Sequence, residues 1–345
     1  MQKRNRAMEL YRFIGAVMIL CYHCYWFAFR EDGEQFVGFY LFVEFYFILS
    51  GFFMMRSARL HVTAEQRLDP AGATWRYILR RLGRFYPHHL LSWALVAAIL
   101  LFVTKTVYPI ELFQTGWTEL LLVNIFGFVR GDYINIVCWY LSALIFVSLP
   151  LYYLILKDED GFIKILAPLI IILCYGTLFD RKGSLANTIV FTQYSAFLGY
   201  LRALADVTVG CVAFRVYEWM EDAKLPGEGI LETLLEGAVM LSSALWMYRN
   251  SGRGDFFFPI LFFAFVISVF RGKSLFTRVF DNAVSAWLGE LSFAYFLNNL
   301  VVIYPVMHFF PDADIWKMCL ICVPACLVLS VITNAIVKPR AKKIP

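Results

Sequence analysis

The sequence predicts an all-α protein that crosses a membrane about ten times, with both termini in the cytoplasm. Hydrophobic residues make up 60% of the chain and charged residues only 17%. Soluble domains are roughly half apolar and about a quarter charged. The charged residues are also grouped between apolar runs that reach the ~20 residues needed to cross the hydrocarbon layer. Lipid is therefore the expected solvent for most of the surface.

Each expected span is an apolar run between charged segments. The first run is a full-length span without a small-residue cleavage site behind it, so we interpret it as a helix and not as a signal peptide. The predicted spans are 7–29, 36–55, 85–104, 134–156, 162–179, 198–217, 230–248, 255–270, 284–308 and 316–337. Residues 1–345 are expected to form a single transmembrane domain with no fused soluble domain.

The basic residues give the expected orientation. Ten spans leave both termini on one side, and the termini and connections of that side hold most of the 31 Lys and Arg residues. The positive-inside rule then places this side in the cytoplasm.

Two connections between spans stand out. Residues 56–84, on the cytoplasmic side, contain seven arginines, of which Arg80 and Arg84 share one helix face. This cluster is either an anchor on anionic lipid or a binding site for a phosphate-bearing ligand, because guanidinium groups match phosphate oxygens. On the other side, residues 120–128 form an apolar stretch that is too short to span, so we expect it to be interfacial or re-entrant.

Ionisable side chains inside spans are costly and therefore indicate function or internal pairing. Arg12 and His23 lie on one face of the first span, about 16 Å apart along its axis. Glu44 in the second span lies within about 3 Å of the depth of His23, which predicts a contact that would make His23 a better general base. Each residue also has a structural alternative. His23 could be satisfied by another neighbour, and Arg12 could pair with Glu9.

Further polar groups occur in later spans. Arg202 and Asp206 are four residues apart, and the simplest interpretation is mutual neutralisation within the bundle. Glu290, Asn298 and Asn299 could line the same cavity as His23 or bridge helices by hydrogen bonds.

No metal site is expected. The eight cysteines all fall within apolar segments, where thiols behave as small hydrophobic groups, and they lack the loop geometry of zinc sites. Ser50 is a nucleophile in principle, but a small residue beside Gly51 in a span is more typical of close helix packing.

Three segments in the first ninety residues resemble, in their order, the motifs of acyltransferase family 3. They are Arg12 and His23 with ten residues between them, the segment 43–52 with Glu44 and Ser50, and the segment 80–87 with Arg80, Arg81 and Arg84. Two looser similarities are Trp139-Tyr140-Leu141-Ser142 and the segment 288–297, which contains Glu290. The chain departs from the pattern at Phe42, Leu144 and Asn299, where many members have Gly, Glu and His.

The resemblance implies a fold and a set of roles. Members of the family are ten-helix membrane proteins that O-acylate envelope polysaccharides, lipopolysaccharide, peptidoglycan and some small molecules. By resemblance, His23 supported by Glu44 is the catalytic base. The implied ligands of the acyl-coenzyme A phosphates are Arg12, Arg80, Arg81 and Arg84, and the implied substrate or cavity residues are Ser50, Trp139, Glu290 and Asn299.

The expected function is O-acylation in the bacterial cytoplasmic membrane. The donor is acetyl-CoA or another acyl-CoA, and the acceptor is a glycan or a lipid-linked molecule; a separate periplasmic transferase is a compatible partner, whereas nucleic acid is not. One alternative is a proton-coupled transporter or flippase in which Arg12, His23 and Glu44 form a relay. Another is an inactive homologue that serves as a scaffold, which Leu144 and Asn299 would favour.

Overall fold

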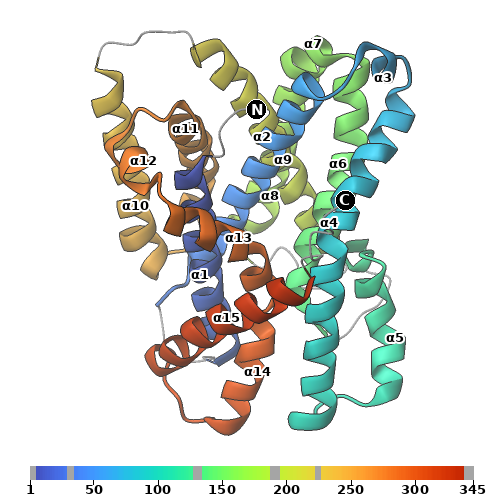
Figure 1. Ribbon diagram of the computed structural model, residues 1–345, viewed down its shortest axis with the longest axis vertical. Helices are drawn as coiled ribbons and strands as arrows, with labels where there is room; N and C mark the ends of the chain where they lie inside the picture. The colour runs from blue at the N-terminus through green and yellow to red at the C-terminus, as the bar shows by residue number, and fades with distance from the viewer. Residues whose placement is uncertain (1–4, 29–34, 127–133, 187–194, 222–226, 338–345) are drawn as a thin grey trace, which may run out of the picture.

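The computed structural model describes residues 5–28, 35–126, 134–186, 195–221 and 227–337, and within these ranges the chain is helical without a strand (Figure 1). The longer helices are α1 (Arg6–Ala28), α2 (Phe42–Leu60), α4 (Pro70–Ala98), α5 (Pro109–Leu120), α6 (Trp139–Lys157), α8 (Ala167–Lys182), α9 (Ser195–Glu221), α10 (Glu228–Arg249), α11 (Phe258–Arg271), α13 (Ala283–Leu297), α14 (Asn299–Phe309) and α15 (Ile315–Val337). The short ones are α3 (Ala64–Leu68), α7 (Glu159–Gly161) and α12 (Leu275–Phe280).

The helices confirm a multi-pass membrane protein. Among the described residues, eight helical segments are long and apolar enough to cross a membrane, or nine if the bent pair α13 and α14 is one span. The 27-residue helix α9 is not in this set, and it carries Arg202, Asp206 and Arg215. The expected number of ten spans and the cytoplasmic position of the termini therefore stay predictions.

Two expected boundaries differ from the observed ones. Helix α4 begins at Pro70, well before the predicted start at residue 85, because the Asp69 side chain caps the amide of Gly72 (2.9 Å) and proline suits the first helical turn. The arginines of the segment 80–87 thus lie on a helix. The predicted span 284–308 is two helices, α13 and α14, bent by 59° at Asn298.

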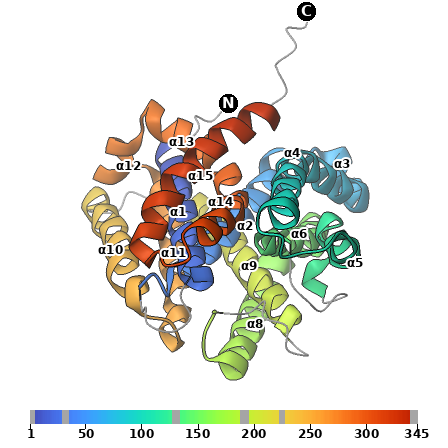
Figure 2. The same cartoon turned by 90° about the horizontal axis from the view of Figure 1, so that it is seen from below.

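Helix α1 occupies the centre of the bundle, in contact with α2, α13, α14 and α15 (Figure 2). Glycines permit the closest helix contacts. A Cβ atom on Gly51 of α2 or on Gly210 of α9 would lie 1.9 Å from a backbone oxygen of the other helix, and one on Gly289 of α13 would lie 2.2 Å from α1. The contact at Gly51 agrees with the packing interpretation of the Ser50–Gly51 pair.

The apolar stretch 120–128 follows α5 as a turn and a short 3₁₀ helix, Asn124–Phe126. Residues 127 and 128 lie outside the described ranges, as does most of the connection 30–35 between the first two spans.

Candidate active site

Helix α1 runs without interruption from Arg6 to Ala28, so Arg12 and His23 share a face three turns apart. Gly15 lies between them, and its missing side chain leaves room for the ring of Phe42, which a Cβ atom would approach to 3.0 Å.

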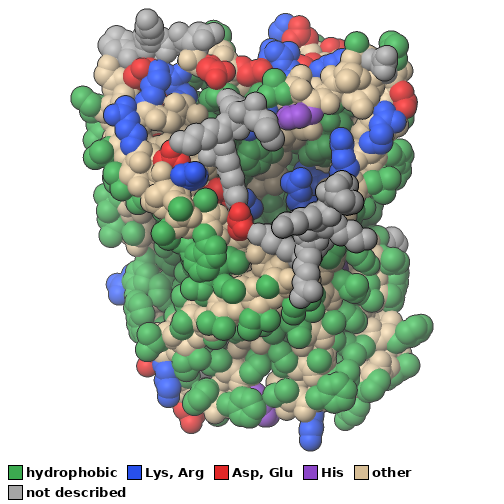
Figure 3. Space-filling model, in the orientation of Figure 1, with side chains coloured by type: hydrophobic (Ala, Val, Ile, Leu, Met, Phe, Trp, Pro, Cys, Tyr) green, Lys and Arg blue, Asp and Glu red, His purple; other side chains and the backbone are tan. Residues whose placement is uncertain are grey.

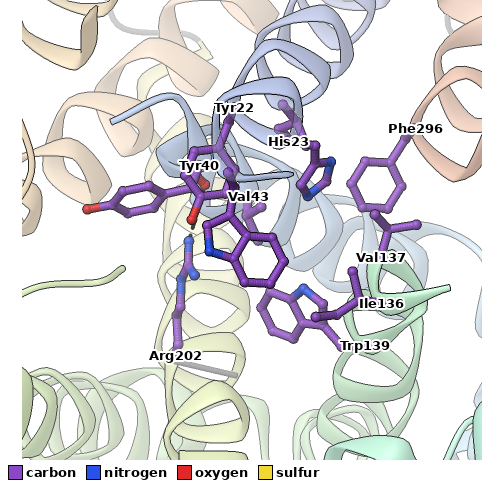
Figure 4. A pocket seen from close by; sticks show the side chains of 11 residues that line it. Tyr22, His23, Tyr40, Val43, Ile136, Val137, Trp139, Arg202 and Phe296 are labelled. Atoms are coloured by element: carbon purple, nitrogen blue, oxygen red, sulfur yellow. Dashed lines mark hydrogen bonds between the residues drawn. The ribbon is translucent and has the colours of Figure 1, made fainter. Parts of the chain in front are cut away.

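His23 lines a cavity whose wall is largely aromatic (Figure 4). The imidazole points into it from α1, with Phe296 and Trp139 on neighbouring walls. The lining residues are Ile19, Tyr22, His23, Trp26, Tyr40, Val43, Ile136, Val137, Trp139, Arg202 and Phe296. An apolar pocket with a few convergent polar groups is the usual form of a small-molecule site.

The polar partner of His23 is Asn299, which corrects the expected contact with Glu44. The Nδ2 atom of Asn299 lies 3.1 Å from Nδ1 of His23, and both side chains are buried. Asn299 begins α14 immediately after the bend, and the bend turns its side chain towards α1. A broken helix at membrane depth is tolerated where it lines a cavity or is buried in protein.

Glu44 instead binds Arg202, so the main partner of Arg202 is Glu44 and not the expected Asp206, whose charge also acts on Arg202. Both carboxylate oxygens accept from the guanidinium, Oε2 from Nη2 at 2.7 Å and Oε1 from Nε, while Nη2 also donates to the Tyr40 carbonyl at 3.2 Å. Asp206 accepts from the Tyr175 hydroxyl at 2.5 Å. The reason is the close contact of α2 with α9, which brings Arg202 to the level of Glu44.

The face of the molecule in Figure 3 is hollowed in its upper half, between α4 on one side and α12 and α13 on the other, with Lys and Arg side chains on the walls. Arg81 of α4 donates to Ser148 of α6, and Tyr46, whose ring centroid lies 6.3 Å from that of Tyr140 in α6, donates to the carbonyl of Arg12. We call the hollow in Figure 3 the basic hollow. Arg12 pairs with Glu9 at 2.7 Å, the alternative that the sequence left open.

The three arginines of α4 differ in their surroundings. Arg81 is half-buried and donates to the Tyr77 hydroxyl (2.7 Å) and to Ser148 Oγ (3.3 Å). Arg80 and Arg84 are exposed. The helix thus directs Arg81 towards α6 and leaves the other two on its outer surface.

Three aromatic rings in mutual contact link the backbone of Arg12 to the wall of the His23 cavity, and we call them the aromatic partition. Tyr46, Tyr140 and Phe296 have ring centroids 5.5–6.3 Å apart. The Tyr46 hydroxyl donates to the carbonyl of Arg12, and the Tyr140 hydroxyl lies 3.2 Å from Ser50 Oγ. Phe296 also lines the His23 cavity. The partition therefore touches both Arg12 and the cavity.

The remaining predicted residues lie in different places. Trp139 lines the cavity, Ser50 is at the aromatic partition, and Glu290 is exposed on α13. Within the described ranges no cluster of three or more His, Cys, Asp or Glu residues is placed to hold a metal ion.

Several cavity residues escaped the sequence analysis. Trp26 stands three residues after His23, so helical spacing could have found it, whereas the adjacent Tyr22 does not follow from that spacing. Arg202 was recognised as a buried charge, but its position opposite α1 depends on the α2–α9 contact.

The comparisons with known proteins identify the family of the chain. The family model described as an acyltransferase domain, that of acyltransferase family 3, matches residues 5–334. No curated protein and no solved structure matches the chain. Because the family model covers almost the whole chain, the protein belongs to acyltransferase family 3 and is a membrane acyltransferase.

Proposed function

We propose that the protein transfers an acyl group, in the first instance acetyl, from cytoplasmic acyl-CoA to a hydroxyl of an envelope glycan or glycolipid. The observation that carries this proposal is the division of α1 between two spaces. Arg12 pairs with Glu9, and its carbonyl accepts from Tyr46 of the aromatic partition, whereas His23, three turns further along α1, lines the aromatic cavity. The two-sided arrangement suits a donor and an acceptor that arrive from opposite sides of the bacterial cytoplasmic membrane.

The donor would enter through the basic hollow. Its phosphates carry several negative charges, which guanidinium groups bind through paired N–H donors. Arg12 and Arg81, both half-buried, are the inner contacts in this proposal, and the exposed Arg80 and Arg84 attract the donor to the entrance. The thioester then passes the aromatic partition to reach His23.

His23 would act as the base. Its imidazole takes the proton of the acceptor hydroxyl while the oxygen attacks the thioester carbonyl carbon, so that a C–O bond forms. The tetrahedral intermediate then expels the thiolate as the C–S bond breaks. The imidazolium returns the proton to the thiolate sulfur, and the products are an ester and coenzyme A, without a net change in protons.

The wall of the cavity supports a sugar-like acceptor. Trp26, Trp139 and Tyr22 offer flat rings for the C–H faces of a sugar, and their N–H and O–H groups can bond its hydroxyls. The basic hollow would then face the cytoplasm and the cavity would face the envelope, as the positive-inside rule requires.

The proposal is tested with detergent-purified protein and radiolabelled acetyl-CoA, with and without an envelope glycan extract. We expect slow release of coenzyme A and passage of the label into the glycan, and loss of both in His23→Ala. The matched control is His308→Ala, because His308 is exposed at the end of α14. Transport of a substrate across proteoliposomes without thioester consumption would instead support the transporter alternative.

A further inference from the structure

Glu119 is a fully buried carboxylate in the part of the molecule that holds the cavity wall, and the mechanism above does not use it. Only 1% of the residue is exposed. We propose that Glu119, acting through Asn135, is a positioning residue of the acyl transfer that fixes the wall of the cavity and the bend that carries Asn299. This inference rests on the proposed function.

One carboxylate oxygen of Glu119 accepts hydrogen bonds from two different segments of the chain. Its Oε2 atom accepts from the backbone N–H of Asn135 at 2.9 Å and from Trp93 Nε1 at 3.0 Å. The carbonyl of Glu119 also lies 3.0 Å from Nε2 of His89. The end of α5 is thereby joined to α4 on one side and to the segment that precedes α6 on the other.

Asn135, held by Glu119, in turn fixes the position of two neighbouring parts of the site. Along the chain it directly precedes Ile136 and Val137, which line the cavity together with Trp139. Through space its Nδ2 atom donates to the carbonyl of Leu297 at 3.3 Å and lies 3.2 Å from Ser92 Oγ. One buried residue thus holds both a wall of the cavity and the last residue of α13.

The contact with Leu297 matters because of the bend. A helix that ends leaves carbonyl groups without partners, and inside a membrane such groups need another donor. The Leu297 carbonyl receives two donors, Asn135 Nδ2 and the Ser92 hydroxyl at 2.5 Å. Two residues later Asn299 contacts His23. The direction of α14, and with it the Asn299 amide, therefore depends on this bond.

Three buried polar atoms of the cluster lower the stability of the fold, and a cluster that served stability alone would lack them. Among the residues that the structure describes, Glu119 Oε1, Asn135 Oδ1 and His89 Nδ1 are buried and have no hydrogen-bond partner. A buried polar atom without a partner costs about 1–3 kcal/mol, and apolar side chains of similar shape would avoid that cost. The cluster is thus expensive for stability, which favours a role in geometry.

The test compares Glu119→Ala with Glu119→Gln. Glutamine keeps an acceptor oxygen for the two N–H groups, so Glu119→Gln should stay within about threefold of wild type, whereas Glu119→Ala should lose about tenfold to a hundredfold in kcat. The KM for acetyl-CoA should stay within about twofold, because the phosphates bind at the other end of α1. The matched control is Trp93→Phe, which removes the other bond to the same oxygen and should retain kcat.

Asn135→Ala provides a second, independent variant with the same expected loss in kcat. The double variant Glu119→Ala/Asn135→Ala should be no worse than either single change, because both act through one chain of bonds. The inference is overturned if Asn135→Ala keeps the wild-type kcat, or if Glu119→Gln is as impaired as Glu119→Ala. A wild-type protein that consumes no thioester would overturn the proposed function instead.

Discussion

The side-chain amide of Asn299 meets the imidazole of His23 with 3.1 Å between Nδ2 and Nδ1. An amide carries a donor on one side and an acceptor on the other, so rotation by 180° lets the same contact serve either tautomer of the ring. A base at Nε2 needs the hydrogen on Nδ1 and the amide oxygen as its acceptor. In the proposed mechanism Asn299 would therefore set the tautomer of His23.

Replacement of Asn299 tests this role. Asn299→Asp offers only acceptor oxygens when ionised and should keep the acyl transfer activity, whereas Asn299→Leu removes the contact and should lower kcat by about tenfold or more. The measurement is the release of coenzyme A. The neighbouring change Asn298→Leu is the control, since Asn298 donates to Thr333 Oγ1 at 2.9 Å. Wild-type turnover in Asn299→Leu would contradict the assignment.

Loss of either partner of the buried pair of Glu44 and Arg202 should lower the free energy of unfolding by more than the loss of their hydrogen bonds alone would. Each single change, Glu44→Gln or Arg202→Met, separates a charge from its buried partner and should cost about 3–5 kcal/mol. The double variant should lose less than the sum of the two. Thermal unfolding in detergent, followed by circular dichroism, measures this. Strictly additive losses would show that the two side chains do not depend on each other.

The α2–α9 contact should be sensitive to a single methyl group. Gly51→Ala places a Cβ atom against a backbone oxygen of α9, so the helices must separate and the protein should lose about 1–3 kcal/mol or more. Gly176→Ala is the matched change, because Gly176 is exposed in α8 with nothing within 4 Å. It should stabilise the protein by about 0.5–1 kcal/mol. Equal melting temperatures for both variants would refute the prediction.

The arginines of α4 should contribute unequally to donor binding. Arg81→Ala removes an inward guanidinium and should raise the KM for acetyl-CoA about tenfold, as for the loss of a charge-assisted bond. Arg80→Ala removes an exposed charge and should change KM less than about threefold, an effect that salt reduces. Arg81→Lys keeps the charge but loses the paired N–H donors of the guanidinium, so its KM should lie between those of the two alanine variants. A larger effect of Arg80→Ala would reverse the order proposed here.

Stability should also depend on pH through Glu119. Burial raises the pKa of this carboxyl from 4.5 to about 7, against the opposing effect of the N–H groups of Asn135 and Trp93. The folded protein then binds the proton more tightly than the unfolded chain, so the free energy of unfolding falls as the pH rises from 4.5 to 7, by roughly 3 kcal/mol. Glu119→Gln should lack this contribution. Parallel stability curves for the two proteins would contradict the prediction.

Much of the fold follows from composition, because apolar length alone locates helices in lipid. The starts and breaks of helices were harder to predict. The first turns of α4 are amphipathic and rich in arginine, so an apolar run marks only the later part of that helix. The bend at Asn298 falls inside a run that is apolar on both sides. In the sequence, only the adjacent Asn298 and Asn299 mark the position of the bend.

The candidate site shows where local arguments fail. Depth along two neighbouring helices made Glu44 the natural partner of His23. The observed partners come from α9 and α14, which are far away in sequence, and they reach α1 and α2 through the glycine contacts and the bend. Such pairings depend on tertiary packing, which cannot be predicted from helical periodicity or residue spacing.

The aromatic partition has a consequence for the membrane itself. An enzyme whose two substrates enter from opposite sides must not become a channel, since a continuous aqueous path would dissipate the ion gradients of the cell. In the proposed mechanism the rings of Tyr46, Tyr140 and Phe296 would close that path, with Tyr46 held by a backbone carbonyl and Tyr140 held by Ser50. The rings that would admit the thioester would then also preserve the electrical insulation of the bilayer between turnovers.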